Sequence, residues 1–413
     1  MSEQQDKTTA TPSAMEAVAT RVVQMLQDSG HVAYFAGGCV RDLVMGRGPH
    51  DYDVATSATP EQVSKLFHRT QLVGAKFGVA LVRMKKQSIE VATFRTDHAY
   101  EDGRRPTGVT FSSPQEDAQR RDFTINGMFY DPIRREVIDF VGGRADISAR
   151  VIRAIGDAER RFAEDHLRLL RAVRFAARLG FSIEPMTWEA MRRHAPELRK
   201  ISPERIRMEL DGALANPNRA EAMRLVSEAG LLGHLWTDAA GLSNTIESAI
   251  ARLRCLPELA GFDLAMAALL SELTPAAAVQ SLESLRCSNE TTAIVHWLLK
   301  HQDDLYVPSK VTPADLKLLM SHRAFGDLLS LVEARLQGKG QAAGCVAEIR
   351  IRADSIRPED VAPEPFVNGD DLKAMGLVPG PRYKTMLESL YYAVERRHFI
   401  ARGGHEARGR ILG

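Results

Sequence analysis

The chain has few cysteines, and they are widely spaced. Its 413 residues include only Cys39, Cys255, Cys287 and Cys345, and their separations fit neither a zinc knuckle nor a small disulfide framework. We therefore expect a reducing compartment, the cytoplasm, and no structural metal.

Long apolar runs and a strong charge of either sign are also missing. No stretch approaches the ~20 apolar residues that span a bilayer, and residues 1–14 lack the basic flank and apolar core of a secretory signal. The formal net charge of +1 argues against a uniformly basic RNA-coating protein, although a local basic surface could still bind phosphate. We expect no membrane span, and no obligate protein partner is evident.

What the sequence does contain is a change of pattern after about 150 residues. Helical patterns rich in Leu, Ala and Arg dominate from Phe162 to the end, which predicts an α+β part followed by an all-α part. A chain of this length is expected to form more than one core. Short strands are expected at His31–Phe35, Tyr52–Ala55, Val79–Met84, Ser88–Phe94, Val109–Phe111 and Glu136–Phe140.

Two acids separated by one residue form the first candidate site. In Asp51-Tyr52-Asp53 the two-residue period of a strand would point both carboxylates to one face, where they repel each other unless a cation lies between them. Mg²⁺ suits such a pair because it prefers oxygen ligands and leaves positions for substrate phosphates. Glu90 is the best third acid. Alone, this short pattern is more often a turn cap or a solvated strand face.

A glycine turn lies upstream of these acids, in the run from Ala36 to Asp42. Gly37 and Gly38 let backbone amides approach a phosphate, and the start of the following helix favours an anion. A Walker loop is excluded because no Gly-Lys-Ser/Thr follows, and the third glycine of a dinucleotide fingerprint is missing. The turn and the acids together predict one nucleotide site.

These residues resemble motif A of the polymerase-β-type nucleotidyltransferases, in the bacterial class II branch that contains tRNA CCA-adding enzymes and poly(A) polymerases. The run 120–126 resembles the branch's second motif, and Asp131-Pro132 with 139–143 resembles its third. The resemblance implies a polymerase-β-like nucleotidyltransferase head, in which Asp51, Asp53 and Glu90 are catalytic and the first two bind metal. It also implies nucleotide contacts from Gly37, Gly38, Arg41, Arg121, Asp122 and Asn126.

A segment that begins at Glu164 offers a way to select bases. Asp165 and Arg168, neighbours on an expected helix, place an acceptor beside a donor, which matches the base edge that cytosine and adenine share. For an arbitrary helix, a solvated, salt-bridged face would explain them equally well. The run is similar to the family's nucleotide-selecting motif, which implies that Asp165 and Arg168 read the base and Glu164 orients Arg168. Arg171 and Arg174 would contact the triphosphate or brace the motif.

The resemblance implies that the 3′-hydroxyl of tRNA attacks the α-phosphate of CTP or ATP, with two Mg²⁺ ions in the site. It further implies a disordered tail at 1–14, a head at 15–155, a nucleotide-selecting and RNA-binding neck at 156–220, a helical body at 221–356 and a tRNA-binding tail at 357–413. Residues 96–108 are expected to form a mobile loop that reshapes the pocket between C and A addition. Residues 357–369 are expected to be a linker.

Several alternatives remain open. A poly(A) polymerase or an A-adding specialist would share these motifs, although residues 72–78 look more like the CCA-adding form. A D-x-D glycosyltransferase would bind a nucleotide through Mg²⁺ but would not explain the Arg-Arg-Asp motif or the base-reading pair. A catalytically silent RNA-binding scaffold would leave the acid pair without a purpose.

Overall fold

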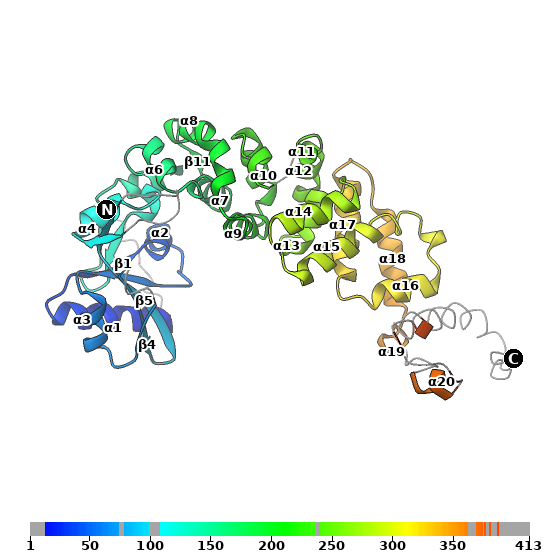
Figure 1. Cartoon of the computed structure of the whole chain (residues 1–413), viewed down its shortest axis with the longest axis horizontal. Coiled ribbons are helices and arrows are strands. Elements are labelled where there is room, and N and C mark those ends of the chain that lie inside the picture. Colours follow the sequence, from blue (N-terminus) through cyan, green and yellow to red (C-terminus); the bar gives the residue numbers. More distant parts are fainter. Residues whose placement is uncertain are drawn as a thin grey trace, which may run out of the picture. The chain divides into compact units, whose positions relative to one another are not determined.

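The computed structural model describes residues 13–73, 78–98, 108–236, 240–361 and 369–374, together with residues 376, 380, 386 and 387. Contacts divide the chain into two compact units. Unit 1 comprises residues 1–243 and 284–286, and unit 2 comprises residues 244–283 and 287–413. Unit 1 begins with strands and short helices, whereas unit 2 is helical (Figure 1). The predicted sequence of an α+β part and a helical remainder is therefore confirmed.

A seven-stranded sheet forms the centre of the first part of unit 1. Its order is β3-β4-β5-β2-β1-β8-β9; β2 and β5 run parallel, and the other neighbours run antiparallel. The expected strands are found, most with their ends shifted by one or two residues. The sheet also contains two strands that were not predicted, β3 (Thr70–Leu72) and β8 (Phe129–Asp131). Its other strands are β1 (Ala33–Ala36), β2 (Asp53–Thr56), β4 (Val79–Met84), β5 (Gln87–Thr93) and β9 (Glu136–Ile138).

Apolar side chains at alternate positions of these strands are buried and form the core beside the sheet. Helix α1 (Ala14–Asp28) packs on β1, β2 and β5 through a stripe that includes the fully buried Val22 and Leu26. Other buried side chains, among them Phe94 and Phe129, form a further cluster. The first part also contains α2 (Gly38–Val44), α3 (Pro60–Leu66), the hairpin of β6 (Arg95–Asp97) with β7 (Val109–Phe111), α4 (Pro114–Gln119) and the short η2 (Thr124–Asn126).

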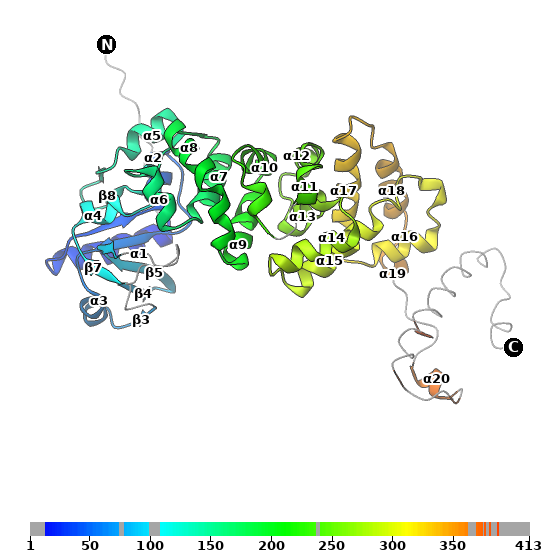
Figure 2. The same cartoon turned by 45° about the horizontal axis from the view of Figure 1, so that its top comes forward.

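The second part of unit 1 is helical apart from two short paired strands, β10 (Val151–Ile152) and β11 (Ser182–Ile183). Helices α7 and α9 lie side by side (Figures 1 and 2). Leu170 and Val173 of α7 are buried, as predicted, and so is Leu210 of α9. The helices are α5 (Gly143–Ala149), α6 (Ala158–Glu164), α7 (Arg168–Leu179), α8 (Pro185–His194), α9 (Pro203–Leu214), α10 (Arg219–Glu228) and α11 (Ala240–Ser243).

The prediction that the segment from Glu164 to Arg168 opens one helix is wrong. Helix α6 ends at Glu164, Asp165 is extended with φ −147° and ψ 103°, and α7 begins at Arg168. The cause is the Asp165 side chain, whose Oδ1 accepts a hydrogen bond from the Leu167 amide at 3.1 Å. A short acidic side chain that binds a nearby backbone amide competes with helical hydrogen bonding, so the chain turns here.

Unit 2 is built around an apolar helix, α13 (Phe262–Leu270), in which Leu264 to Leu270 are all buried. Helices α12, α15 and α17 pack against it (Figure 2). Within the described residues, no helix is both long and apolar enough to span a bilayer. The other helices are α12 (Ile246–Cys255), α14 (Pro275–Ser284), α15 (Asn289–His301), α16 (Pro313–Met320), α17 (Phe325–Gln337), α18 (Gly344–Asp354), α19 (Pro358–Val361) and α20 (Gly369–Ala374).

A close backbone approach in unit 1 gives the first prediction. A Cβ on Gly143 would overlap the carbonyl oxygen of Thr124 and come within 2.8 Å of Met128 Cγ, and the backbone carbonyl cannot move without shifting η2. We expect Gly143→Ala to lower the free energy of unfolding by about 2–3 kcal/mol, measured by urea denaturation. Gly326→Ala is the control, because nothing lies within 4 Å of its Cβ position. Equal stability of both variants would contradict the prediction.

Candidate active site

A pocket of about 630 Å³ in unit 1 gathers most of the residues predicted from the motifs. Its walls come from both parts of the unit: β1, β2, β5, α2 and the segment after α4 on one side, and the segment before α7 and α7 itself on the other. The predicted residues that line it are Gly37, Gly38, Arg41, Asp53, Glu90, Arg121, Asp122, Asn126, Asp165, Arg168 and Arg171. Asp51, Glu164 and Arg174 are not among the lining residues.

Two acids face each other across neighbouring strands at the floor of the pocket. Asp53 of β2 is in register with Glu90 of β5, so adjacent-strand spacing brings the two carboxylates together. The prediction that Asp51 lies on the same strand as Asp53 is wrong, because β2 begins only at Asp53. Tyr52 is nevertheless buried between two exposed acids, and the charge of Asp51 reaches Asp53.

The electrostatics of Asp53 are unfavourable for an ionised acid. Desolvation of its carboxyl group, followed by the charge of Glu90, raises its pKa from 3.8 to about 6; Arg121 lowers this pKa and Asp51 raises it further. The carboxylate is accessible from the pocket, so water screens part of this repulsion. A cation between these acids would remove the rest.

The donor set can be compared with the needs of a metal ion. In the described ranges, no three His, Cys, Asp or Glu side chains converge into a site that holds a metal by protein ligands alone. Mg²⁺ does not require such a site, because it commonly binds through one or two carboxylates and takes its other oxygens from substrate phosphates and water. The residues present fit a cation that arrives with a nucleotide.

The glycine turn lies beside these acids at the end of β1. Gly37 has φ +76°, which an L side chain rarely adopts, and a Cβ there would lie 3.5 Å from Nη1 of Arg121. Gly38 begins α2. The Cys39 thiol donates to the Ala36 carbonyl at 3.2 Å, and burial raises its pKa to about 11, so it is an inert packing residue. The backbone of Gly37 and the guanidinium of Arg121 therefore lie close together at the glycine turn.

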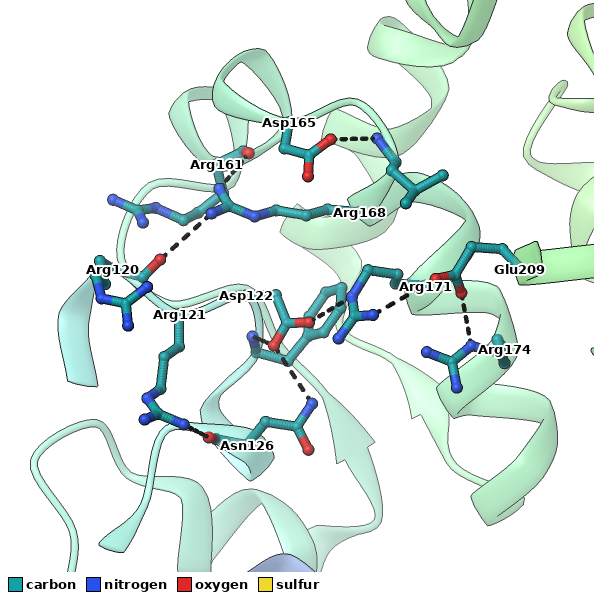
Figure 3. A network of polar contacts seen from close by, with 12 residues as sticks. Arg120, Arg121, Asp122, Asn126, Arg161, Asp165, Arg168, Arg171, Arg174 and Glu209 are labelled. Atoms are coloured by element: carbon teal, nitrogen blue, oxygen red, sulfur yellow. Dashed lines mark hydrogen bonds and ion pairs between the residues drawn. The ribbon is translucent and has the colours of Figure 1, made fainter. Parts of the chain in front are cut away.

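An alternating series of charged and polar side chains crosses the site (Figure 3). Arg41 is only 4% exposed and donates to Oδ1 of Asn126 at 2.9 Å. Asn126 donates to Asp122 at 3.3 Å, and Arg171 donates to the other oxygen of Asp122 at 2.8 Å. Arg171 also reaches Glu209 of α9 at 3.5 Å. Burial would raise the pKa of Asp122, but Arg171 holds it below its usual value.

The two residues predicted to read the base both line the pocket, but they are not paired with each other. Arg168 donates to Glu164 at 2.8 Å, to the Arg161 carbonyl at 2.7 Å and to the Arg120 carbonyl at 3.3 Å (Figure 3). The contact with Glu164 is the one that the motif implied. Asp165 instead accepts from Arg205 of α9 at 2.8 Å. Asp165 and Arg168 are thus each held by a different partner.

Arg171 and Arg174, whose roles the motif left open, share a partner on α9. Both donate to Glu209, Arg174 at 2.6 Å, and Gly212 leaves room for Arg174, whose Cδ would lie 2.9 Å from a Cβ on that glycine. In this structure the two arginines brace α7 against α9. The motifs gave no role to Arg205 or Glu209, because their partners lie far away in the sequence.

Sequence reasoning also missed Asp117, a carboxylate that is only 1% exposed. Its Oδ1 accepts from Arg120 at 2.8–2.9 Å and from the Arg95 amide at 3.2 Å, and its Oδ2 accepts from Nε and Nη2 of Arg121 at 3.2 and 3.0 Å. The arginine charges hold its pKa low although burial alone would raise it. One carboxylate therefore fixes both arginines and leaves Nη1 of Arg121 facing the glycine turn. The i+3 and i+4 spacing was the available signal.

Two sequence predictions cannot be compared with this geometry. Most of the expected mobile loop and the segment that favoured the CCA-adding form, at residues 99–107 and 74–77, lie outside the described residues. The same is true of residues 362–368 of the expected linker, whose described start includes α19.

Comparisons with known proteins bear on both parts of unit 1. Residues 33–153 match the family described as the poly A polymerase head domain, and residues 180–240 match the one described as a probable RNA and SrmB-binding site of polymerase A. The CCA-adding enzyme of Geobacillus stearothermophilus is 38% identical over 375 residues, 90% of this chain and 91% of that enzyme. The CCA-adding enzyme of Lactiplantibacillus plantarum is 36% identical over 411 residues, 94% of this chain and 93% of that enzyme.

The chain is also similar to a solved structure of a CCA-adding enzyme. The crystal structure of the Bacillus stearothermophilus CCA-adding enzyme in complex with CTP superposes with a TM-score of 0.77 and 34% sequence identity, covering 94% of each chain.

The raised pKa of Asp53 makes a prediction about stability. Because its folded-state pKa exceeds the unfolded value of 3.8, ionisation of Asp53 costs stability; the cost appears as the pH rises from about 4 and is complete above about 6. We expect Asp53→Asn to raise the free energy of unfolding at pH 7.5, without added metal, by about 1 kcal/mol, a value discounted for solvent screening. The difference should vanish at pH 4. Thermal melts at both pH values measure it, and a less stable variant at pH 7.5 would contradict it.

The anchoring of two arginines by Asp117 makes a further prediction. Asp117→Asn removes the charge and one acceptor oxygen, so we expect the KM for the nucleotide to rise about tenfold and kcat to fall less, with a loss of about 2–3 kcal/mol of stability. Asp131→Asn is the control, because Asp131 is 3% exposed and accepts from Gln27 and nearby amides outside the pocket. Steady-state kinetics and urea denaturation measure both. Equal KM changes in the two variants would contradict the prediction that Asp117 positions the arginines of the pocket.

Proposed function

We propose, because the chain belongs to the family of CCA-adding enzymes, that it is a tRNA nucleotidyltransferase that adds CMP and AMP from CTP and ATP to the 3′ end of tRNA. The family and the enzyme class predicted from the motifs are both confirmed. Relatives that match over about nine-tenths of both chains support the whole activity rather than the head alone.

The observation that carries the proposal is the composition of the pocket. It joins an acid pair, a glycine turn and two base-facing groups that come from sequence segments more than 100 residues apart. Nucleotidyl transfer requires that the triphosphate, the acceptor hydroxyl and the base be positioned together. A simple binding protein would not require the repelling carboxylates of Asp53 and Glu90.

We assign Asp51, Asp53 and Glu90 to the binding of divalent cations, specifically Mg²⁺. Such ions, when bound, neutralise phosphate charge and promote ionisation of the attacking hydroxyl. Around them, Gly37 and Gly38 offer backbone amides to the phosphates, and Nη1 of Arg121 faces the same turn.

The protein selects the base through two side chains that are not paired with each other. The Asp165 carboxylate accepts from an exocyclic amino group, and the Arg168 guanidinium donates to the adjacent ring nitrogen, a combination that cytosine and adenine share. Arg205 and Glu164 hold these groups from behind, which fixes their positions before the nucleotide arrives. Selection of C and A then needs no nucleic-acid template.

The remaining segments receive roles by extension. We propose that residues 156–220 form a nucleotide-selecting and RNA-binding neck, residues 221–356 a helical body, and residues 357–413 a tRNA-binding tail. We also propose that the protein acts in the cytoplasm. A loop at residues 96–108 would reshape the pocket between C and A addition.

A poly(A) polymerase is the rival, because the matching head-domain family carries that description. The test offers the protein three tRNAs, ending at the discriminator base, at C and at CC, with CTP and ATP, and sequences the products. We expect each tRNA to be completed to CCA and extension to stop. Long A tails, or extension of only the CC-ending tRNA, would replace this proposal with a poly(A) polymerase or an A-adding specialist. Asp53→Ala, which should bind tRNA without extending it, is the negative control.

A further inference from the structure

Among the described residues, one arginine of the pocket has no carboxylate partner. Arg178 lies in the last turn of α7, is exposed and lines the pocket. In the part of the chain that the structure describes, its side chain forms no hydrogen bond or ion pair. The other six lining arginines are each paired: Arg41 with Asp42, Arg95 with Asp97, Arg120 and Arg121 with Asp117, Arg168 with Glu164, and Arg171 with Asp122.

The charges of the pocket leave Arg178 uncompensated. Seven arginines and five carboxylates are among the described lining residues. Acids that do not line the pocket, such as Asp42 and Asp117, form ion pairs with other lining arginines. Among the described lining residues, the guanidinium that is available to a ligand is therefore that of Arg178, at the end of α7.

The position of Arg178 along α7 determines what it can contact. With a rise of about 1.5 Å per residue, Arg178 lies about 15 Å along the helix axis from Arg168. It therefore cannot share the base edge that Arg168 faces. Arg171 and Arg174, which lie between them, are both committed to Glu209. Away from the base, a nucleotide or an RNA end presents phosphate, which a guanidinium binds through paired N–H donors.

We propose that Arg178 is a phosphate-binding residue of this pocket. It donates to a phosphate that belongs either to the 3′-terminal nucleotides of the RNA or to the triphosphate of the incoming nucleotide. The inference rests on the proposed function and adds a contact that the motifs did not assign.

A purely structural role makes a different prediction. A cation in the last turn of a helix interacts favourably with the helix dipole, so Arg178 could act only on the stability of α7. Its loss would then lower the melting temperature and leave every ligand affinity unchanged.

The experiment compares Arg178→Gln with Arg178→Lys and with Arg192→Gln in the full chain. Arg192, in the last turn of α8, is also exposed, but it does not line the pocket, so its substitution removes the same charge elsewhere. Three quantities are measured: tRNA affinity as a function of salt, the KM for CTP and ATP, and the melting temperature. A charge-assisted contact is expected to contribute about tenfold in affinity.

The results separate the two phosphate sources. If Arg178 binds the RNA, Arg178→Gln weakens tRNA binding about tenfold and reduces the slope of log K against log salt by about 0.7–0.9. If it binds the triphosphate, the KM for both nucleotides rises about tenfold and tRNA affinity is unchanged. In either case Arg178→Lys, which keeps the charge but loses the paired donors, is affected less than Arg178→Gln. Ligand parameters that match those of Arg192→Gln overturn the proposal, whereas a wild-type protein that extends no tRNA refutes the proposed function instead.

Discussion

The part-buried ion pair between Asp122 and Arg171 is the constraint on which the site depends. Asp122 follows α4, Arg171 belongs to α7, and the two are 49 residues apart in the sequence. A buried carboxylate is costly unless it is paired and hydrogen-bonded, and Asp122 obtains its partners only when α7 lies against the segment after α4. Asn126 extends the contact to Arg41, and Glu209 extends it to α9. One series of polar contacts therefore connects α2, which begins at the glycine turn, with α7 and α9, which carry Arg168 and Arg205.

Three acids in and beside the pocket, Asp53, Asp117 and Asp122, differ in their electrostatic surroundings. Asp117 and Asp122 are surrounded by arginines, which hold their pKa values low, and they position other residues. Asp53 faces Glu90 instead, and its pKa is raised. Ionised groups that repel each other lower the stability of the fold, and such costs are typical of functional sites. The contrast separates the residues that build the pocket from those that we propose act in it.

Local sequence patterns predicted the elements better than the contacts between them. The strand at Val79–Met84 was predicted correctly, because the period of its apolar residues reflects its own burial. The helix across Asp165 was predicted wrongly, because helical spacing alone does not reveal that this side chain binds the Leu167 amide. Arg205 and Glu209 were not recognised as supports of the site, because their partners Asp165 and Arg171 lie about 40 residues away.

The sequence by itself determined the α+β and helical parts, the family, and the residue types that supply carboxylates, glycines and arginines to a nucleotide site. These properties follow from local periodicity and from motifs in which neighbouring residues act together. Only the tertiary structure decided which of the described arginines that line the pocket are committed to a carboxylate and that Arg178 is not. Ion pairing depends on distances between segments far apart in the chain, and these distances exist only after the sheet and the helices have packed.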